Sequence, residues 1–328
     1  MNGVVAIRPG TTRSGRALLS LAALLLPLCA QGGAYTIPAR DSAERQCHRI
    51  GHKLGSVSIR ECLRAGLVDS GARSANGQAI LIRRFPPPAG RRPKARVLLI
   101  GGIHGDEFSS VSIVFKWMRI IKRHHTGLFH WHIIPLANPD GLLRRHSRRV
   151  NGHGVDLNRN FPTRGWSEQS RRYWIRRTHR DPRRYPGPAA ASEPETRALM
   201  EEIARFQPDV IISVHAPYGI LDFDGPPDAP RRFGYLHSRL LGTYPGSLGN
   251  YAGVERHIPV VTMELPYAGI MPPPREIHRM WRDMVRWIRR NIPRADTLRF
   301  RARQHDRPAG RTPRVQSRTD MATVRPTA

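Results

Sequence analysis

Short runs of apolar and β-branched residues alternate along the chain with longer segments of helical period. Five of the short runs are predicted as strands, at 79–82, 97–100, 132–136, 209–214 and 258–263. Three longer segments carry apolar residues three and four positions apart and are predicted as helices, at 108–121, 192–206 and 276–290. Strands that alternate with helices indicate an α/β fold. We therefore expect one α/β domain within roughly residues 35–295 of the 328-residue chain.

The first 34 residues have the pattern of a secretory signal. Three arginines precede an apolar stretch at 17–30, and small residues follow it. We predict a signal peptide at 1–34, export to the periplasm, and no stable membrane span once the signal is removed. The apolar stretch is short for a helix that crosses a bilayer, which makes an uncleaved anchor the alternative. Lipidation at Cys29 stays open, although Leu28 is bulky where the lipidating peptidase requires a small residue.

Two cysteines, Cys47 and Cys62, remain after removal of the predicted signal. In a chain exported to an oxidising compartment we expect them to form a disulfide within an N-terminal extension at 35–70. Two unpaired, packed thiols are the alternative. A metal site is not expected at these cysteines because no second pair completes one.

The formal net charge of +29 is unevenly distributed along the chain. Only four of the 54 basic residues are lysines, so the excess of arginine can reflect a GC-rich genome as easily as phosphate binding. Residues 296–328 are rich in arginine and have almost no apolar periodicity, which predicts a disordered basic tail. Between residues 144 and 184, thirteen arginines minus three acidic residues give +10. We expect this segment to attract an acidic substrate, and we expect no nucleic-acid partner.

Chemically capable side chains follow the carboxyl ends of three predicted strands, the edge at which open α/β sheets bind ligands. His104 and Glu107 come just after the strand at 97–100, and His215 directly follows the strand at 209–214. Two histidines and a carboxylate form a three-ligand zinc site with an open position for water. Glu264 follows a third strand and is a candidate general base for that water. Taken singly, a histidine such as His215 is more often an ordinary hydrogen-bonded residue than a ligand. The zinc site is favoured because these residues occur together at strand ends, beside the glycine pair Gly101–Gly102.

Five ordered motifs resemble the zinc metallocarboxypeptidase family, and the similarity runs from about Gly71 to Trp287. The motifs are Gly102–Glu107, Asn138–Gly141, Gly154–Pro162, Val214–His215 and Thr262–Pro266. The resemblance implies a single zinc-carboxypeptidase-like domain at 71–295, with a mixed central β-sheet flanked by helices and the active site at the carboxyl ends of its strands. It also implies one zinc ion on His104, Glu107 and His215, and Glu264 as the residue that moves the proton.

The resemblance further implies roles for polar residues between the motifs. Arg149 falls where the family places the arginine that stabilises the oxyanion, although Arg145 and Arg148 are close enough in sequence to be alternatives. Asn158 and Arg159 would hold the terminal carboxylate of the substrate, because a guanidinium fork matches two carboxylate oxygens.

Three other segments are interpreted without catalytic roles. Residues 164–185 resemble a variable loop of the family, and His130 and His132 fit a strand face better than a second metal site. Asp222 and Asp224 are expected to be solvated loop carboxylates, with pairing to a substrate ammonium as the alternative.

The leading functional hypothesis is a zinc hydrolase that cleaves the γ-D-glutamyl–meso-diaminopimelate bond of cell-wall peptides. Segments 192–196 and 245–247 resemble the amidases of the family and favour this substrate. The alternatives are an exported carboxypeptidase that removes C-terminal residues, and an N-acyl amino acid deacylase. A basic protein that binds polyanions on a decayed enzyme scaffold is a different class, and it predicts lost ligands where this sequence keeps all of them. The sequence does not establish the oligomeric state.

Overall fold

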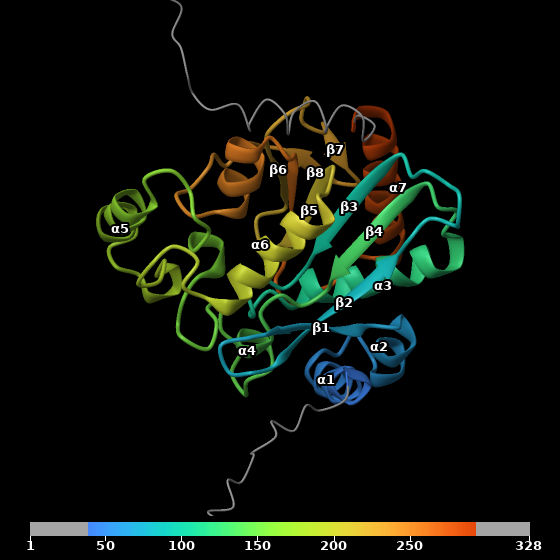
Figure 1. Ribbon diagram of the computed structural model, residues 1–328, viewed down its shortest axis with the longest axis horizontal. Coiled ribbons are helices and arrows are strands. Elements are labelled where there is room, and N and C mark those ends of the chain that lie inside the picture. The colour runs from blue at the N-terminus through green and yellow to red at the C-terminus, as the bar shows by residue number, and fades with distance from the viewer. Residues whose placement is uncertain (1–38, 293–328) are drawn as a thin grey trace, which may run out of the picture. The chain divides into compact units, whose positions relative to one another are not determined.

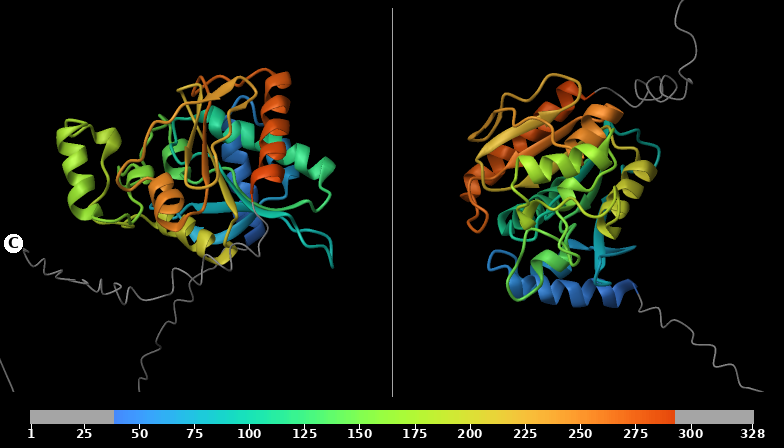
Figure 2. Two further views of the ribbon diagram at one scale, coloured as in Figure 1. Left: turned by 90° about the horizontal axis from the view of Figure 1, so that it is seen from above. Right: turned by 90° about the vertical axis from the view of Figure 1, so that its left-hand side faces the viewer.

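The computed structural model describes residues 39–292, which form one mixed nine-stranded sheet with helices on both faces (Figures 1 and 2). The strand order is β1-β2-β4-β3-β5-β9-β6-β8-β7. The strands are β1 (Val68–Arg73), β2 (Ala79–Phe85), β3 (Ala95–Ile100), β4 (Phe129–Ile134), β5 (Val210–His215), β6 (Ile220–Asp224), β7 (Arg232–Phe233), β8 (Leu236–Ser238) and β9 (Val260–Glu264). The four central strands β4, β3, β5 and β9 are parallel, while β2 and β6 flank them in antiparallel pairs. This confirms the expected mixed α/β architecture.

Two separate hydrophobic clusters cover the two faces of the sheet. The helices are α1 (Ala39–Lys53), α2 (Ile59–Ala65), α3 (Phe108–His124), α4 (Pro139–Leu142), α5 (Trp166–Arg176), α6 (Pro194–Phe206) and α7 (Pro274–Asn291). Helices α3 and α7 pack on one face, and α6 crosses the other face in front of the sheet in Figure 1. No helix within residues 39–292 is long and apolar enough to cross a membrane.

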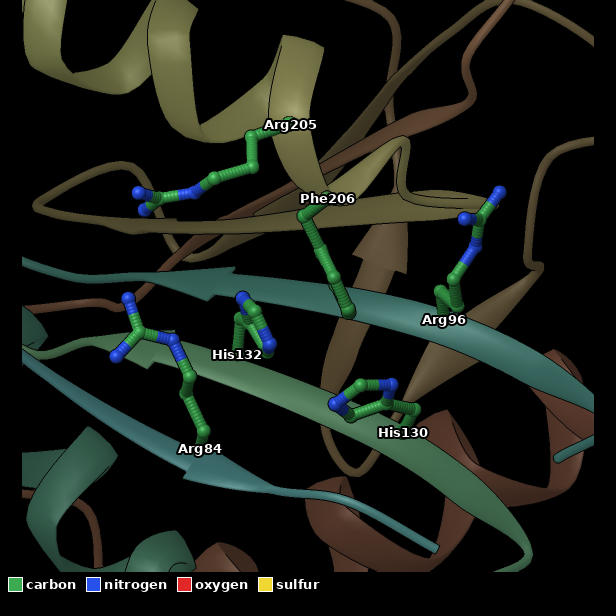
Figure 3. A pocket seen from close by; sticks show the side chains of 6 residues that line it. All are labelled: Arg84, Arg96, His130, His132, Arg205 and Phe206. Atoms are coloured by element: carbon green, nitrogen blue, oxygen red, sulfur yellow. The ribbon is translucent and has the colours of Figure 1, made fainter. Parts of the chain in front are cut away.

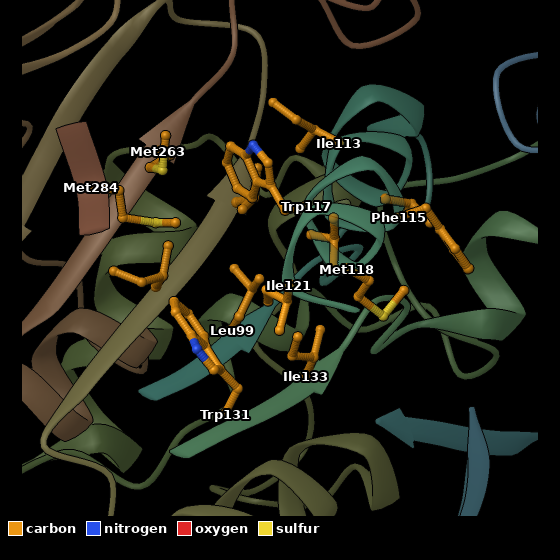
Figure 4. Packing of buried hydrophobic residues seen from close by; sticks show 14 of the residues in the cluster. Leu99, Ile113, Phe115, Trp117, Met118, Ile121, Trp131, Ile133, Met263 and Met284 are labelled. Carbon is orange, nitrogen blue, oxygen red and sulfur yellow. The ribbon is translucent and has the colours of Figure 1, made fainter. Parts of the chain in front are cut away.

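The larger cluster is built around aromatic residues between α3 and the sheet (Figure 4). Trp117 is fully buried, and its indole Nε1 donates a hydrogen bond to the carbonyl of Ile277 at the start of α7 (3.1 Å). Trp131 of β4 and Leu99 of β3 meet this helix layer from the sheet. The indole hydrogen bond matters because a buried polar atom without a partner would destabilise the core.

The segment that precedes β1 packs against the same core as the rest of the domain. A disulfide joins Cys47 of α1 to Cys62 of α2, with the Cα atoms 5.3 Å apart, so the expected pairing is present. Both cysteines are buried in the larger cluster, and the Gln46 amide donates to the carbonyl of Ala79 in β2 (2.8 Å). The boundary expected at residue 70 falls inside β1. The predicted signal peptide at 1–34, the Cys29 question and the tail at 296–328 lie outside the described residues.

Two sequence interpretations are wrong in detail. The segment 164–185 is not only a loop, because it contains α5. Asp222 and Asp224 are not solvated loop residues, because they lie in β6, which pairs with β9. Asp222 is buried and accepts a hydrogen bond from the Leu241 backbone N–H (3.0 Å). Burial raises the pKa of Asp222, and burial together with Asp222 raises the pKa of Asp224 to about 7.

The strands that follow β3 in the chain are added first on one side of β3 and then on the other, and this change of side positions the site. After β3 the chain adds β4 on one side, and it later adds β5 on the other side of β3. The loops that leave β3 and β5 therefore diverge at the carboxyl ends of these strands, which is where sheets of this type bind ligands. Strand β9 lies beside β5 with His215 in register with Glu264.

Candidate metal centre and active site

The turn between β3 and α3 carries the first two predicted ligands. Gly102 has a φ of 63°, a left-handed conformation that side chains disfavour. A Cβ atom on Gly105 would lie 2.2 Å from the carbonyl carbon of Gly141, so only glycine permits this contact. The tight turn places His104 beside Glu107, which occupies the N-cap position of α3.

Three side chains converge at this turn, and all three are buried. The Nδ1 atom of His104 lies 2.8 Å from Glu107 Oε1, and the Nδ1 atom of His215 lies 3.1 Å from Glu107 Oε2. The two Nδ1 atoms are 3.1 Å apart. His104, Glu107 and His215 thus present one ligand atom each within 4.8 Å of the others and could hold a metal ion.

Each of the two histidines is oriented from behind by a second polar group. The Nε2 atom of His104 lies 3.1 Å from Asp156 Oδ1, and the Nε2 atom of His215 lies 2.9 Å from Ser213 Oγ. Both rings therefore direct Nδ1 into the cluster, as metal-ligating histidines do when their other nitrogen is held by a carboxylate or hydroxyl. Two imidazoles and a carboxylate suit zinc with an open coordination position.

The electrostatics of the cluster keep its carboxylates ionised. Burial alone would raise the pKa of Glu107, but His104 and His215 hold it far below its usual range. Burial likewise opposes ionisation of Asp156, whose pKa is held well below its usual range by Arg149 and His104. Ionised carboxylates are the form that a metal ligand and its supporting residue require.

Glu264 lies at the end of β9, and one oxygen of its carboxylate has no partner among the described residues. Its side chain is 7% exposed, and its Oε2 atom is buried without a hydrogen-bond partner among residues 39–292. Burial raises the pKa of Glu264, with Glu107 adding to the rise and His215 opposing it. A carboxylate with a raised pKa and a free oxygen, next to residues that could hold a metal ion, can accept and return a proton.

The arginine nearest to the cluster is Arg149. Its Nε atom donates to Asp156 Oδ2 (3.0 Å), and one terminal nitrogen lies 3.4 Å from Glu107 Oε1. Burial would lower the pKa of Arg149, but these two carboxylates raise it, so the guanidinium stays charged. Of the alternatives, Arg145 and Arg148 are exposed, and no ion pair links them to the cluster within the described part of the chain.

Asn158 and Arg159 follow Asp156 in a short 3-10 turn, η1 (Leu157–Arg159). The Asn158 side-chain oxygen accepts from the Leu248 backbone N–H (2.8 Å), which fixes the amide. Arg159 is buried, and its guanidinium lies 4.4 Å from the centre of the Tyr244 ring. Its Nε atom has no partner among residues 39–292, and burial lowers its pKa. This donor is free to bind an anion.

Sequence reasoning did not single out Asp156, Ser213 or Tyr244. Asp156 lies inside a motif that was identified, and the general rule that ligating histidines are held by carboxylates could have pointed to it. Ser213 lies two residues before His215 on the same face of β5, which is a signal visible in the strand pattern. Tyr244 contacts Arg159 from 85 positions away, and no local pattern predicts that contact.

Residues 65–221 match the model of the zinc carboxypeptidase family. The chain belongs to this zinc-dependent family. It is 38% identical over 144 residues to murein peptide amidase A of Escherichia coli, covering 42% of this chain and 55% of that protein. It is 32% identical over 186 residues to murein peptide amidase A of Vibrio campbellii, covering 55% of this chain and 73% of that protein. The match thus spans little more than half the length of the Escherichia coli relative.

A solved structure supports the same fold. Carboxypeptidase A from Helicoverpa armigera superimposes with a TM-score of 0.54 at 17% identity, covering 75% of this chain and 70% of that chain.

Proposed function

We propose that this protein is a zinc-dependent hydrolase that cleaves the γ-D-glutamyl–meso-diaminopimelate amide bond of murein peptides. The observation that carries the proposal is the convergence of His104, Glu107 and His215 beside Glu264, whose Oε2 atom has no hydrogen-bond partner among residues 39–292. The choice of substrate is supported by the two relatives named murein peptide amidase A.

His104, Glu107 and His215 would hold a single zinc ion. When bound, zinc supplies a Lewis acid that polarises the scissile carbonyl and makes a water molecule easier to deprotonate. The Glu264 carboxylate accepts the proton of the attacking water at Oε2 and delivers it to the diaminopimelate amine as the C–N bond breaks. Burial raises the pKa of Glu264, so its carboxylate holds the transferred proton more readily than an exposed glutamate would.

Arg149 and Arg159 supply positive charge at two points of the bound substrate, the scissile carbonyl and the carboxylate of the diaminopimelate residue. Arg149 balances the negative charge that develops on the carbonyl oxygen, and Asp156 holds its guanidinium in place. Asn158 and Arg159 bind the carboxylate of the residue that leaves, with the free Nε of Arg159 as a donor. The charge of +10 between residues 144 and 184 attracts the carboxylate-rich peptide to this side of the molecule.

Export of the protein to the periplasm would place it beside the murein from which such peptides derive. This part of the proposal rests on the signal-like pattern of residues 1–34.

The test is to incubate the zinc-loaded protein with L-Ala-γ-D-Glu-meso-diaminopimelate, with its α-linked isomer, and with N-blocked dipeptides. We expect release of diaminopimelate from the γ-linked tripeptide and much slower release from the α-linked isomer, measured by mass spectrometry. Strong dipeptide turnover without tripeptide cleavage would instead identify a carboxypeptidase. Release of amino acids from N-acyl derivatives alone would identify a deacylase, and no hydrolysis of any substrate would favour the polyanion-binding class.

A further inference from the structure

Arg184 is held beside the candidate active site by its two neighbours in the chain. The guanidinium of Arg183 lies 2.8 Å from the carboxylate of Asp106, which belongs to the turn that carries two of the candidate ligands. On the other side, the carbonyl of Tyr185 accepts a hydrogen bond from the backbone N–H of Asp156 (2.8 Å). Consecutive Cα atoms are about 3.8 Å apart, so the residue between these two anchors lies at the edge of the site.

The positive charge of Arg184 acts on Arg159, the residue assigned to the carboxylate of the leaving residue. Burial lowers the pKa of Arg159, and the charges of Arg149 and Arg184 lower it further. The ring of Tyr244 lies 4.4 Å from the Arg159 guanidinium. Burial raises the pKa of Tyr244, and the charges of Arg159 and Arg184 both oppose that rise. The two guanidiniums therefore belong to the same side of the site.

Helix α5 fixes the backbone at both of these arginines. The indole Nε1 of Trp166, at the start of α5, donates a hydrogen bond to the carbonyl of Arg159 (2.9 Å). The indole Nε1 of Trp174 donates to the carbonyl of Asp181 (2.8 Å), three residues before Arg184. One helix thus ties down both segments, so the two arginines are placed by the fold before any ligand binds.

Arg184 differs from the neighbouring arginines because no carboxylate binds it closely. Arg149 and Arg183 each have a nitrogen within 3.0 Å of a carboxylate oxygen. The Nε atom of Arg184 lies 3.8 Å from the Asp181 carboxylate, which is beyond hydrogen-bond distance. Its side chain is 33% exposed, so a ligand can reach its terminal nitrogens. Arg159 also has a buried Nε atom without a partner among residues 39–292. Both guanidiniums are therefore available to bind anions.

We propose that Arg184 binds the second carboxylate of the residue that hydrolysis releases, and that it thereby selects a dicarboxylic leaving residue. The inference rests on the proposed function, in which Arg159 binds the first carboxylate of that residue. Two neighbouring positive charges repel each other, and one carboxylate compensates only one of them. Diaminopimelate is lysine with a second carboxylate on its ε carbon. A guanidinium fork can bind that carboxylate through two hydrogen bonds, so Arg184 distinguishes the two amino acids.

The experiment compares two tripeptides, L-Ala-γ-D-Glu-meso-diaminopimelate and L-Ala-γ-D-Glu-L-Lys, which differ only in the second carboxylate. The value of kcat/KM for each is measured by mass spectrometry with the zinc-loaded unmodified protein and with Arg184→Gln. We expect Arg184→Gln to cleave the diaminopimelate peptide with a kcat/KM about tenfold lower, because a charge-assisted hydrogen bond is lost. The same variant should cleave the lysine peptide as the unmodified protein does.

Two further variants separate the fork of Arg184 from its charge and from the net charge of the protein. Arg184→Lys keeps the charge without the fork, so it should restore only part of the preference for diaminopimelate, and it tests the same contact if Arg184→Gln is poorly folded. Arg119→Gln removes an exposed arginine on α3 and should leave the kcat/KM of both peptides unchanged.

The outcomes separate this inference from the proposed function. Cleavage of both peptides by the unmodified protein with the same kcat/KM would overturn the role of Arg184 alone. The role is equally overturned if Arg184→Gln loses activity toward both peptides to the same extent, or toward neither. No cleavage of either peptide by the unmodified protein would overturn the proposed function, and this inference with it.

Discussion

Replacement of Asp156 by asparagine should weaken metal binding without changing any ligand. Asp156 holds His104 through Oδ1 (3.1 Å) and Arg149 through Oδ2 (3.0 Å), and it is fully buried. An asparagine of the same shape has one oxygen and one NH₂ group, so it can accept only one of these two hydrogen bonds. Loss of a charge-assisted hydrogen bond destabilises by about 1.5–3 kcal/mol. The zinc affinity should therefore fall roughly 10- to 100-fold.

The assay is competition for zinc against a chromogenic chelator, which measures affinity independently of turnover. Asp283→Asn is the control. Asp283 is likewise a carboxylate that accepts a hydrogen bond, from the backbone N–H of Gly234 (2.9 Å), but it lies in α7 away from the cluster. The thermal unfolding midpoint of both zinc-free variants shows whether each is folded. Equal zinc affinity in Asp156→Asn and the unmodified protein would refute the role assigned to Asp156.

Three further outcomes are expected. Replacing Cys47 and Cys62 together by serine should lower the free energy of unfolding by about 3 kcal/mol, measured by urea denaturation, because the disulfide closes a loop of 15 residues; an unchanged value would contradict this. The pKa of Asp224 is about 7 in the folded protein against 3.8 for a free aspartate, so folding favours the protonated side chain. The stability that this preference gives is complete below pH 3.8 and is lost as the pH rises to 7. Asp224→Asn should therefore raise the free energy of unfolding at pH 8 by about 2 kcal/mol, after allowance for partial exposure, and should flatten the pH profile between pH 4 and 7. The kcat/KM for the tripeptide should fall as ionic strength rises, because salt screens the basic segment at 144–184, and a flat profile would separate that charge from substrate capture.

The central strands and the candidate metal ligands His104, Glu107 and His215 could be predicted from the sequence because both depend on local patterns of residues. The run at 97–100 is apolar on both faces, and it forms most of β3, which begins two residues earlier and spans Ala95–Ile100. The helix predicted at 108–121 ends three residues later, at His124. The strand predicted at 132–136 begins earlier, at Phe129, and ends at Ile134 because Pro135 follows it.

The parts that could not be predicted depend on contacts between distant residues. Helix α5 is mostly polar, so its sequence is hard to tell from a loop. Strand β6 carries Asp222 and Asp224, which are rare in strands, and it is fixed by pairing with β9. A cavity beside α6 is lined by Arg84, Arg96 and His130, among others (Figure 3). It exists only because β2 and β3 flank β4, which the order of the strands along the chain does not reveal.

The most direct test of the central claim is zinc content and turnover measured together on the unmodified protein and on Glu264→Gln. We expect one zinc ion per chain in both. We also expect tripeptide turnover to fall by roughly 10²- to 10⁴-fold in the variant, because the residue that moves the proton is lost while the three ligands remain. Retained turnover in zinc-loaded Glu264→Gln, or unmodified protein that hydrolyses the tripeptide without zinc, would contradict this mechanism.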